Sequence, residues 1–248
     1  MTVGVGKAAT ATVRIEQTSA VPFRWEADMT GAVEDRIRTL VGSTFAPDAT
    51  VREVTSPRGI IDLLAVSFDA RALESRQSAG VGAVTLPMRV RALDALRVDR
   101  EIRLTTLALK LGTTPDALVR STLRPLAEDG LVNLKDKRAS RSEVWRPLAS
   151  HITAVELKLS KWRGALQQAD NAAMCSNRAW VVLDRQRGQA AVSAADTFRA
   201  FGVGLALLDS TGALKVVVRP RRRRTTRWFR AYVAEVAWAA ASAPTPRG

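Results

Sequence analysis

The chain has 248 residues, with 38 lysines and arginines against 24 aspartates and glutamates, and a formal net charge of +14. Hydrophobic residues make up 46% and charged residues 25%, which excludes disorder over most of the chain. The single cysteine excludes a disulfide framework, and no apolar run approaches the roughly 18 residues of a membrane span. We therefore expect a cytoplasmic protein with no membrane partner, which binds a polyanion through its positive charge.

The first part of the chain has the pattern of a mixed α/β domain. The first 20 residues are small and polar and predict a loose arm or a short strand. Apolar residues at spacings of three and four predict an amphipathic helix over 24–41. Strands at 50–54 and 60–68 are expected to form a hairpin around the turn at 56–59.

A different pattern begins near Thr85 and continues to about residue 148. It predicts three helices and then two short strands, at 88–96, 104–111, 115–129, 131–134 and 143–145. Gly112 permits a sharp turn, and Thr113 or Thr114 can cap the next helix, which has Pro115 at its first position. The pattern therefore predicts two helices joined by a tight turn.

The third of these helices leaves a polar face next to a basic hairpin. Asp116, Arg120, Ser121 and Arg124 lie on its outer face, while Pro125 is expected to bend it. The hairpin tip is basic and suits phosphates, with Lys135, Lys137 and Arg138 at the tip and Arg141 nearby. Over about 60 residues this pattern resembles the winged helix-turn-helix family, which implies contact between the third helix and a DNA groove. A small helical subdomain that binds protein, or merely packs, is the alternative.

After residue 148 the chain returns to the pattern of a mixed α/β domain. This pattern predicts strands and helices at 152–159, 161–173, 179–183, 194–200, 203–208, 214–218 and 226–241. Within 152–159 the residues alternate strictly, which puts Glu156 and Lys158 side by side on one face of the strand. Asp62 interrupts the apolar strand at 60–68, where a charge is costly unless a cation or a donor satisfies it.

Asp62, Glu156 and Lys158 are the residue types that metal-assisted phosphodiester hydrolysis requires. Asp62 and Glu156 can hold Mg²⁺ through oxygen ligands, and the ion would activate a water and neutralise charge on the phosphate. Lys158 could act as the base that orients this water or as a charge stabiliser in the transition state. A surface ion pair between Glu156 and Lys158, with Asp62 hydrogen-bonded at a strand end, is the structural alternative.

The order of these motifs resembles the PD-(D/E)XK nuclease superfamily. The matching residues are Gly59-Ile60-Ile61-Asp62, then Val155-Glu156-Leu157-Lys158, then a helix that contains Gln168-Ala169. The resemblance implies a restriction-endonuclease-like mixed sheet flanked by helices, with Mg²⁺ or Mn²⁺ on Asp62 and Glu156. It also implies a supporting glutamine, Gln168, and a glutamate from the first helix, for which Glu34 is the first choice and Glu26 the second. The proline-aspartate pair of the family is absent.

The spacing of the motifs indicates an insertion. Asp62 and Glu156 are 94 residues apart, and removing the 64 residues of 85–148 leaves 30, an ordinary connection within one sheet. We therefore expect a discontinuous nuclease-like domain, 1–84 and 149–248, with an inserted winged helix-turn-helix domain at 85–148.

Most of the excess charge belongs to two segments. The 85–148 segment contributes +5, and residues 215–230, which include Arg221, Arg222, Arg223 and Arg224, contribute +8. We expect both to contact DNA phosphates, on either side of the acidic site; a solvated basic linker is the alternative for 215–230. Trp25 is expected in the core, and Trp145 between the two domains. His151 is not expected to act as a base, and Cys175 is expected to be inert.

The sequence thus predicts a nucleoid-associated endonuclease that cleaves DNA, with a duplex as the expected form, in the presence of Mg²⁺ or Mn²⁺. Double-strand cleavage would indicate a homodimer, because one active site cuts one strand at a time. The alternatives are a DNA-binding protein or transcription regulator on an inactive nuclease fold, and an RNA-directed nuclease or RNA-binding subunit.

Overall fold

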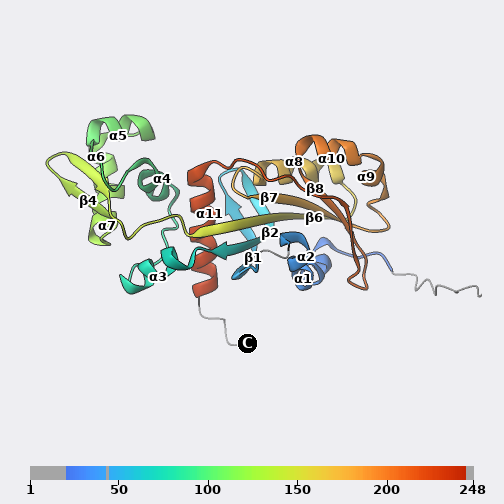
Figure 1. Cartoon of the computed structure of the whole chain (residues 1–248). Coiled ribbons are helices and arrows are strands. Elements are labelled where there is room, and N and C mark those ends of the chain that lie inside the picture. The colour runs from blue at the N-terminus through green and yellow to red at the C-terminus, as the bar shows by residue number, and fades with distance from the viewer. Residues whose placement is uncertain (1–20, 43–44, 244–248) are drawn as a thin grey trace, which may run out of the picture.

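The computed structural model describes residues 21–42 and 45–243, so the predicted arm at 1–20 lies outside the described residues. The chain forms a mixed α/β structure around a six-stranded sheet of order β1-β2-β6-β7-β8-β9 (Figure 1). These strands are β1 (Ala49–Ser56), β2 (Gly59–Phe68), β6 (Ala149–Lys158), β7 (Arg178–Asp184), β8 (Gly204–Leu208) and β9 (Leu214–Val218). The predicted mixed α/β class is confirmed.

The sheet combines two antiparallel ends with a parallel centre. β1, β2 and β6 pair antiparallel, β6, β7 and β8 pair parallel, and β9 returns antiparallel to β8. The central strands are apolar and buried along most of their length because helices cover both of their faces. β2 and β6 are thus neighbours although the 85–148 segment separates them in sequence.

Helices cover both faces of the sheet. Helix α1 (Glu26–Asp35) buries Met29 and Val33, and α2 (Ile37–Val41) buries Leu40, against the face of the sheet that carries Leu63, Val155 and Trp180. The opposite face carries α8 (Trp162–Ala172), α10 (Ala195–Phe201) and α11 (Arg227–Ser242); the remaining helices outside the 85–148 segment are α3 (Ala70–Ser78) and α9 (Gln189–Ser193). The predicted helix over 24–41 is therefore two helices, and the sequence pattern missed α3.

The 85–148 segment forms a helical unit with its own small sheet. Its elements in chain order are α4 (Pro87–Ala95), β3 (Ile102–Arg103), α5 (Leu104–Leu111), α6 (Pro115–Leu118), the π-helical turn η1 (Val119–Leu123), α7 (Arg124–Glu128), β4 (Val132–Lys135) and β5 (Arg138–Arg141). β5 lies between β3 and β4 in an antiparallel sheet. Asp136 and Lys137 form the tight turn with positive φ angles of 48° and 57°.

The second hairpin strand was predicted wrongly, and the third helix is irregular. The second hairpin strand is β5, at Arg138–Arg141, and not at 143–145, because the turn consists of only two residues. The third helix contains the π-helical turn η1 immediately before α7, whose second residue is Pro125. The wider turn accommodates a proline, which cannot donate a backbone hydrogen bond, without ending the helix.

The 85–148 segment packs directly on α11. Val90 and Leu93 of α4 share one hydrophobic core with Ala234 of α11 and with Leu64 of β2. Trp145 is fully buried and donates a hydrogen bond to Glu235 of α11, which confirms its predicted place between the two parts. The prediction for Trp25 was wrong, because this side chain is 60% exposed at the start of α1. Within 21–42 and 45–243, no helix is long and apolar enough to cross a bilayer.

Candidate active site

Asp62 lies where the pairing of β2 with both of its neighbours is interrupted. The β2–β6 register ends at the pair of Leu63 with Val155, and the Asp62 carboxylate then accepts a 2.8 Å hydrogen bond from the backbone N–H of Leu157. On the other side, β1 skips Glu53, which has a φ of 51°. A left-handed backbone at a residue other than glycine is costly, so the surrounding pairs of β1 and β2 must hold it in place.

At the interruption the alternation of side chains between the two sides of the sheet shifts by one residue, in β1 and in β2 alike. Val51 and Val54 on β1 both contact the core on the α11 side, and so do Ile61 and Leu64 on β2. A spacing of three between inward residues is incompatible with a regular strand, in which inward positions are two or four residues apart. Asp62, at this shift, contributes to a cavity shared with α1.

Lys158 is the centre of the polar contacts at this place. Its Nζ is 3.4 Å from Asp62 Oδ2, 3.2 Å from Glu26 Oε2 and 2.9 Å from the carbonyl oxygen of Leu157. Burial lowers the pKa of Lys158, but the carboxylates of Asp62 and Glu26 raise it by more, so its pKa lies above the ordinary value. Lys158 is therefore a protonated donor in this arrangement, suited to charge stabilisation and not to accepting a proton.

Glu156, two residues before Lys158 on β6, is almost completely buried, with 1% of its surface exposed. Burial, together with the charge of Asp62, raises the pKa of Glu156 to about 8, although Lys158 opposes this. Neither of its carboxylate oxygens has a hydrogen-bond partner among the described residues. Two nearby carboxylates repel each other when both are ionised, so the charge of Asp62 favours a protonated Glu156.

The supporting residues expected around this centre are arranged differently from the sequence prediction. Glu34 forms an ion pair with Arg52 of β1, with 2.8 Å between Glu34 Oε1 and Arg52 Nε, whereas Glu26 contacts Lys158. The structure thus brings the second choice, Glu26, to the site. Gln168 is exposed on α8, outside the contacts that join Asp62, Lys158 and Glu26.

The site is open to solvent through a cavity of about 450 Å³ whose lining includes Asp62 and Glu26. Arg52 and Glu53 of β1 also line it, and sequence patterns gave no signal for either residue. Glu26 and Glu34 lie eight residues apart, near the two ends of α1, so the position of α1 relative to the end of β6 decides which of them reaches Lys158.

Two residues of the site, Asp62 and Glu156, are suited to bind a hard cation. In the described ranges no three His, Cys, Asp or Glu residues are gathered so that they could hold a metal ion. The paired carboxylates of Asp62 and Glu156 nevertheless supply oxygen ligands, and the unpartnered, buried oxygens of Glu156 are the kind of group that a cation satisfies. Lys158 provides the positive charge at this place.

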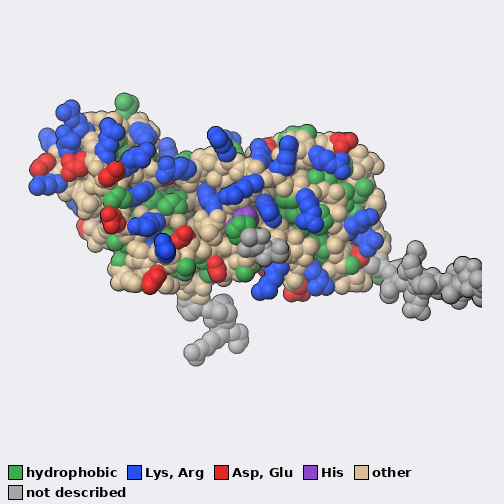
Figure 2. Space-filling view, viewed as in Figure 1, with side chains coloured by type: hydrophobic (Ala, Val, Ile, Leu, Met, Phe, Trp, Pro, Cys, Tyr) green, Lys and Arg blue, Asp and Glu red, His purple; other side chains and the backbone are tan. Residues whose placement is uncertain are grey.

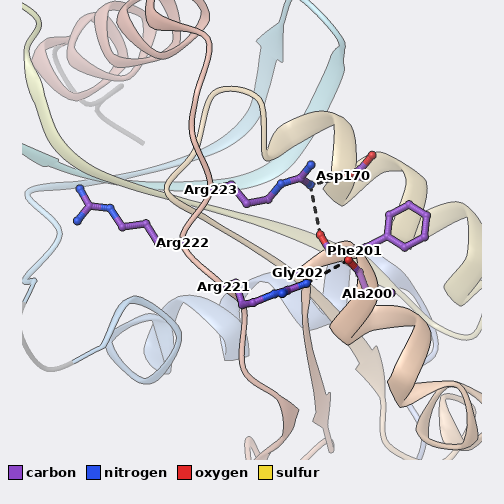
Figure 3. A pocket seen from close by; sticks show the side chains of 7 residues that line it. All are labelled: Asp170, Ala200, Phe201, Gly202, Arg221, Arg222 and Arg223. Carbon is purple, nitrogen blue, oxygen red and sulfur yellow. Dashed lines mark hydrogen bonds and ion pairs between the residues drawn. The ribbon is translucent and has the colours of Figure 1, made fainter.

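The arginine segment, Arg219–Arg224 after β9, divides into two sets. Arg221 donates to the carbonyl oxygens of Arg199 and Ala200 at the end of α10. Arg223 donates to the carbonyl oxygen of Phe201 and forms an ion pair with Asp170. These contacts form the wall of a cavity of about 500 Å³, from which the Arg222 side chain extends in the opposite direction (Figure 3). All four predicted DNA contacts, Arg221 to Arg224, are exposed, but Arg221 and Arg223 use part of their guanidinium groups in contacts with the protein.

The arginine segment lies at the opposite end of the strands from the acidic site. The backbone N–H of Arg223 donates to the carbonyl oxygen of Asn177, next to the amino end of β7, whereas Lys158 ends β6. Because Thr153 pairs with Arg178, five residues of β6, or roughly 17 Å, separate the two places along the strand. Basic side chains extend from the end that carries α5 to α7 across the middle of one face (Figure 2). This differs from the expected arrangement with a basic patch on each side of the acidic site.

The predicted DNA contacts of the 85–148 segment are exposed with one exception. Those on the helix and at the hairpin tip are exposed: Arg120, Ser121, Arg124, Lys135, Lys137 and Arg138. The Ser121 hydroxyl donates to the carbonyl oxygen of Ala117. Arg141 instead points inward, where it donates to the carbonyl oxygen of Leu93 at 3.3 Å and lies 5.1 Å from the ring of Trp145. Arg141 therefore does not belong to the hairpin tip.

His151 and Cys175 have structural surroundings. His151 is stacked on Phe45 with 4.1 Å between ring centroids, and burial together with Arg178, Arg230 and Arg222 lowers its pKa to about 4. Burial raises the pKa of the Cys175 thiol to about 12. A neutral imidazole and an undissociated thiol agree with the expectation that neither residue takes part in catalysis.

Comparisons of the chain with known protein families, with curated proteins and with solved structures each gave no match. The candidate site is therefore defined by its own geometry.

Proposed function

We propose that the protein is a DNA-binding endonuclease that hydrolyses phosphodiester bonds with Mg²⁺ or Mn²⁺. The observation that carries the proposal is the meeting of Asp62, Glu156 and Lys158 at the interruption between β2 and β6. The three residues come from positions up to 96 apart in the sequence, and they meet where β6 ends in the mixed sheet. This supports the restriction-endonuclease-like arrangement that the motif order implies.

The chemical roles follow from the surroundings of each residue. Asp62 and Glu156 would hold the divalent cation, which supplies Lewis-acid activation of a water and neutralises charge on the scissile phosphate. Lys158 keeps its proton because of Asp62 and Glu26, so its ammonium would bind the phosphate oxygens that gain charge during the reaction. Glu26 orients this ammonium through its 3.2 Å contact. The cavity beside Asp62 gives the phosphate a path to the site.

The 85–148 segment supports binding of a DNA duplex. Its order of helix, strand, two helices and two strands, with β5 between β3 and β4, agrees with a winged helix-turn-helix unit. The exposed Arg120 and Arg124 would enter the major groove, while Lys137 and Arg138 would contact phosphates. A cavity of about 460 Å³ lies between the start of α6 and the hairpin tip. Association with the nucleoid and pairing of two copies for double-strand cuts are part of this proposal.

A supercoiled plasmid tests the proposal. The wild-type chain is expected to nick or linearise it with Mg²⁺ or Mn²⁺ and to leave it intact with a chelator. Asp62→Ala and Lys158→Ala are expected to lose this activity. Equal nicking by the wild-type chain and by both variants would mean that a contaminant or another site is responsible, and would end the proposal.

One observation favours a second candidate function, a metal-independent DNA-binding protein or regulator. Lys158 already neutralises Asp62 and Glu26, and no cluster of three metal-ligating side chains occurs in the described part of the chain. For such a protein, a discrete footprint on DNA would persist unchanged in the presence of a chelator, and no cleavage would accompany it. Competition of duplex DNA with RNA at constant salt distinguishes both candidates from an RNA-binding protein.

A further inference from the structure

A small basic cavity, the junction cavity, lies where the 85–148 segment meets α11. It has a volume of about 310 Å³. Its charged lining comes from four elements and their ends: Arg91, Asp94 and Arg97 from α4 and the residues after it, Lys110 from α5, Arg141 from β5 and Arg227 from α11. Five cationic side chains and one carboxylate therefore line this cavity.

Arg141 is the most deeply placed of these cations. Its Nε is buried without a hydrogen-bond partner among the described residues, and its Nη1 donates to the carbonyl oxygen of Leu93. Burial lowers the pKa of Arg141, and so does the charge of Arg227, whereas Asp94 opposes both. A lowered pKa for a guanidinium next to a carboxylate means that burial and the surrounding positive charges together outweigh that carboxylate.

The protein's own groups compensate only part of this charge. Asp94 is 3.2 Å from Arg227, and Arg91 lies over the ring of Trp228 at 5.3 Å from its centroid. Arg97 and Lys110 remain exposed at the cavity. Grouped like charges repel one another, and an anion bound among them removes the repulsion. Arginine and lysine donors in a polar cavity suit the oxygens of a phosphate.

We propose that the junction cavity binds a backbone phosphate of the DNA strand that passes from the 85–148 segment toward the arginine segment. The cavity lies between these two surfaces in the fold, because α11 follows the arginine segment directly and contributes Arg227. The identification of the phosphate as part of DNA rests on the proposed DNA binding, whereas the anion site itself does not. No sequence pattern marks the cavity, since its residues come from separate elements.

The salt dependence of DNA binding tests this proposal. The double variant Arg97→Gln with Lys110→Gln removes two exposed cations from the cavity and leaves Arg141 in place. For a short duplex, the slope of log K against log salt is expected to fall by about 0.9 for each phosphate that the variant no longer neutralises. Arg71→Gln, an exposed arginine on α3 outside the cavity, is the matched control and is expected to keep the wild-type slope.

Pyrophosphate, titrated calorimetrically, is the second probe. The wild-type chain is expected to bind it, and the double variant is expected to bind it at least tenfold more weakly. An unchanged salt slope with normal DNA binding would overturn the proposal. Pyrophosphate binding without any DNA binding would overturn its DNA part together with the proposed function. A reduced slope in a protein that cleaves no DNA would support the proposal while the endonuclease function fails.

Discussion

The indole nitrogen of Trp145 donates a 2.9 Å hydrogen bond to the buried carboxylate of Glu235 on α11. The same carboxylate accepts a 2.8 Å hydrogen bond from the backbone N–H of Val84 and pairs with Arg76, which is fully buried. Residues 84 and 145 lie close to the two places where the chain enters and leaves the 85–148 segment. One carboxylate therefore holds both connections, and the segment has a defined orientation on the sheet domain.

Removing the charge of Glu235 is expected to destabilise the protein strongly. Glu235→Gln leaves the buried Arg76 guanidinium without its counter-charge, which typically costs about 3–5 kcal/mol. Trp145→Phe removes one donor and is expected to cost about 1–3 kcal/mol. Urea unfolding measures both changes, with Glu74→Gln, an exposed glutamate on α3, as the control. Equal stabilities of Glu235→Gln and the control would contradict this account of the junction.

The raised pKa of Glu156 predicts a pH dependence of stability. The folded state binds a proton at Glu156 up to about pH 8, whereas the unfolded state releases it near 4.5. The free energy of unfolding therefore falls as pH rises through this window, by at most about 1.4 kcal/mol per pH unit. Glu156→Gln removes this dependence.

We accordingly expect Glu156→Gln to be more stable than the wild type above about pH 8 and to approach it below about pH 5. Urea unfolding at several pH values checks this, and Glu143→Gln, an exposed glutamate, is the control for loss of one charge. A constant difference between Glu156→Gln and the wild type at all pH values would show that Glu156 ionises normally.

The two sets of arginines after β9 are expected to respond differently to substitution. Arg222→Gln and Arg224→Gln should weaken DNA binding and lower its salt slope, because these exposed side chains are available to phosphates. Arg221→Gln should chiefly lower stability, because it removes donors to the carbonyl oxygens of Arg199 and Ala200. Fluorescence anisotropy with a labelled duplex and urea unfolding separate the two effects. Identical DNA affinity of Arg222→Gln and the wild type would contradict the assignment.

The contacts of Lys158 predict which glutamate of α1 supports the site. Glu26→Gln weakens the orientation of the Lys158 ammonium and should lower the cleavage rate by roughly tenfold. Glu34→Gln breaks only the partly exposed ion pair with Arg52 and should leave the rate nearly unchanged. Cleavage of the same duplex by both variants measures this. The reverse order of effects would mean that Glu34 is the catalytic neighbour.

Local patterns in the sequence were sufficient for the strands of the acidic site. The strict alternation of residues in 152–159 predicts the strand β6, and the charge at Asp62 predicts that a cation or a donor satisfies it, because both features are local. The left-handed residue Glu53 could not be predicted in this way. Its conformation depends on the pairing of β1 with β2, which the sequence of one strand does not contain.

The basic residues illustrate the same limit. The cluster 221–224 is obvious in the sequence, but which of its side chains contact the protein depends on where α10 ends, at Ala200 and Phe201. Arg141 is adjacent to the hairpin tip in sequence, yet it turns inward because Trp145 and α4 provide a ring and a carbonyl oxygen there. The choice between Glu26 and Glu34 similarly requires the position of α1 against β6.

The most direct measurement of the proposed function is the single-turnover cleavage rate of a labelled DNA duplex by the wild-type chain and by Asp62→Asn, in Mg²⁺ and with DNA binding saturated. Asparagine keeps the size of the side chain and an acceptor for the Leu157 N–H, but it removes the charge that faces Lys158 and the cation. We expect cleavage by the wild type and a rate at least about 100-fold lower for Asp62→Asn at equal DNA affinity. Equal rates for the two proteins, or no cleavage by the wild type, would contradict the proposal that Asp62 belongs to a phosphodiester-hydrolysing site.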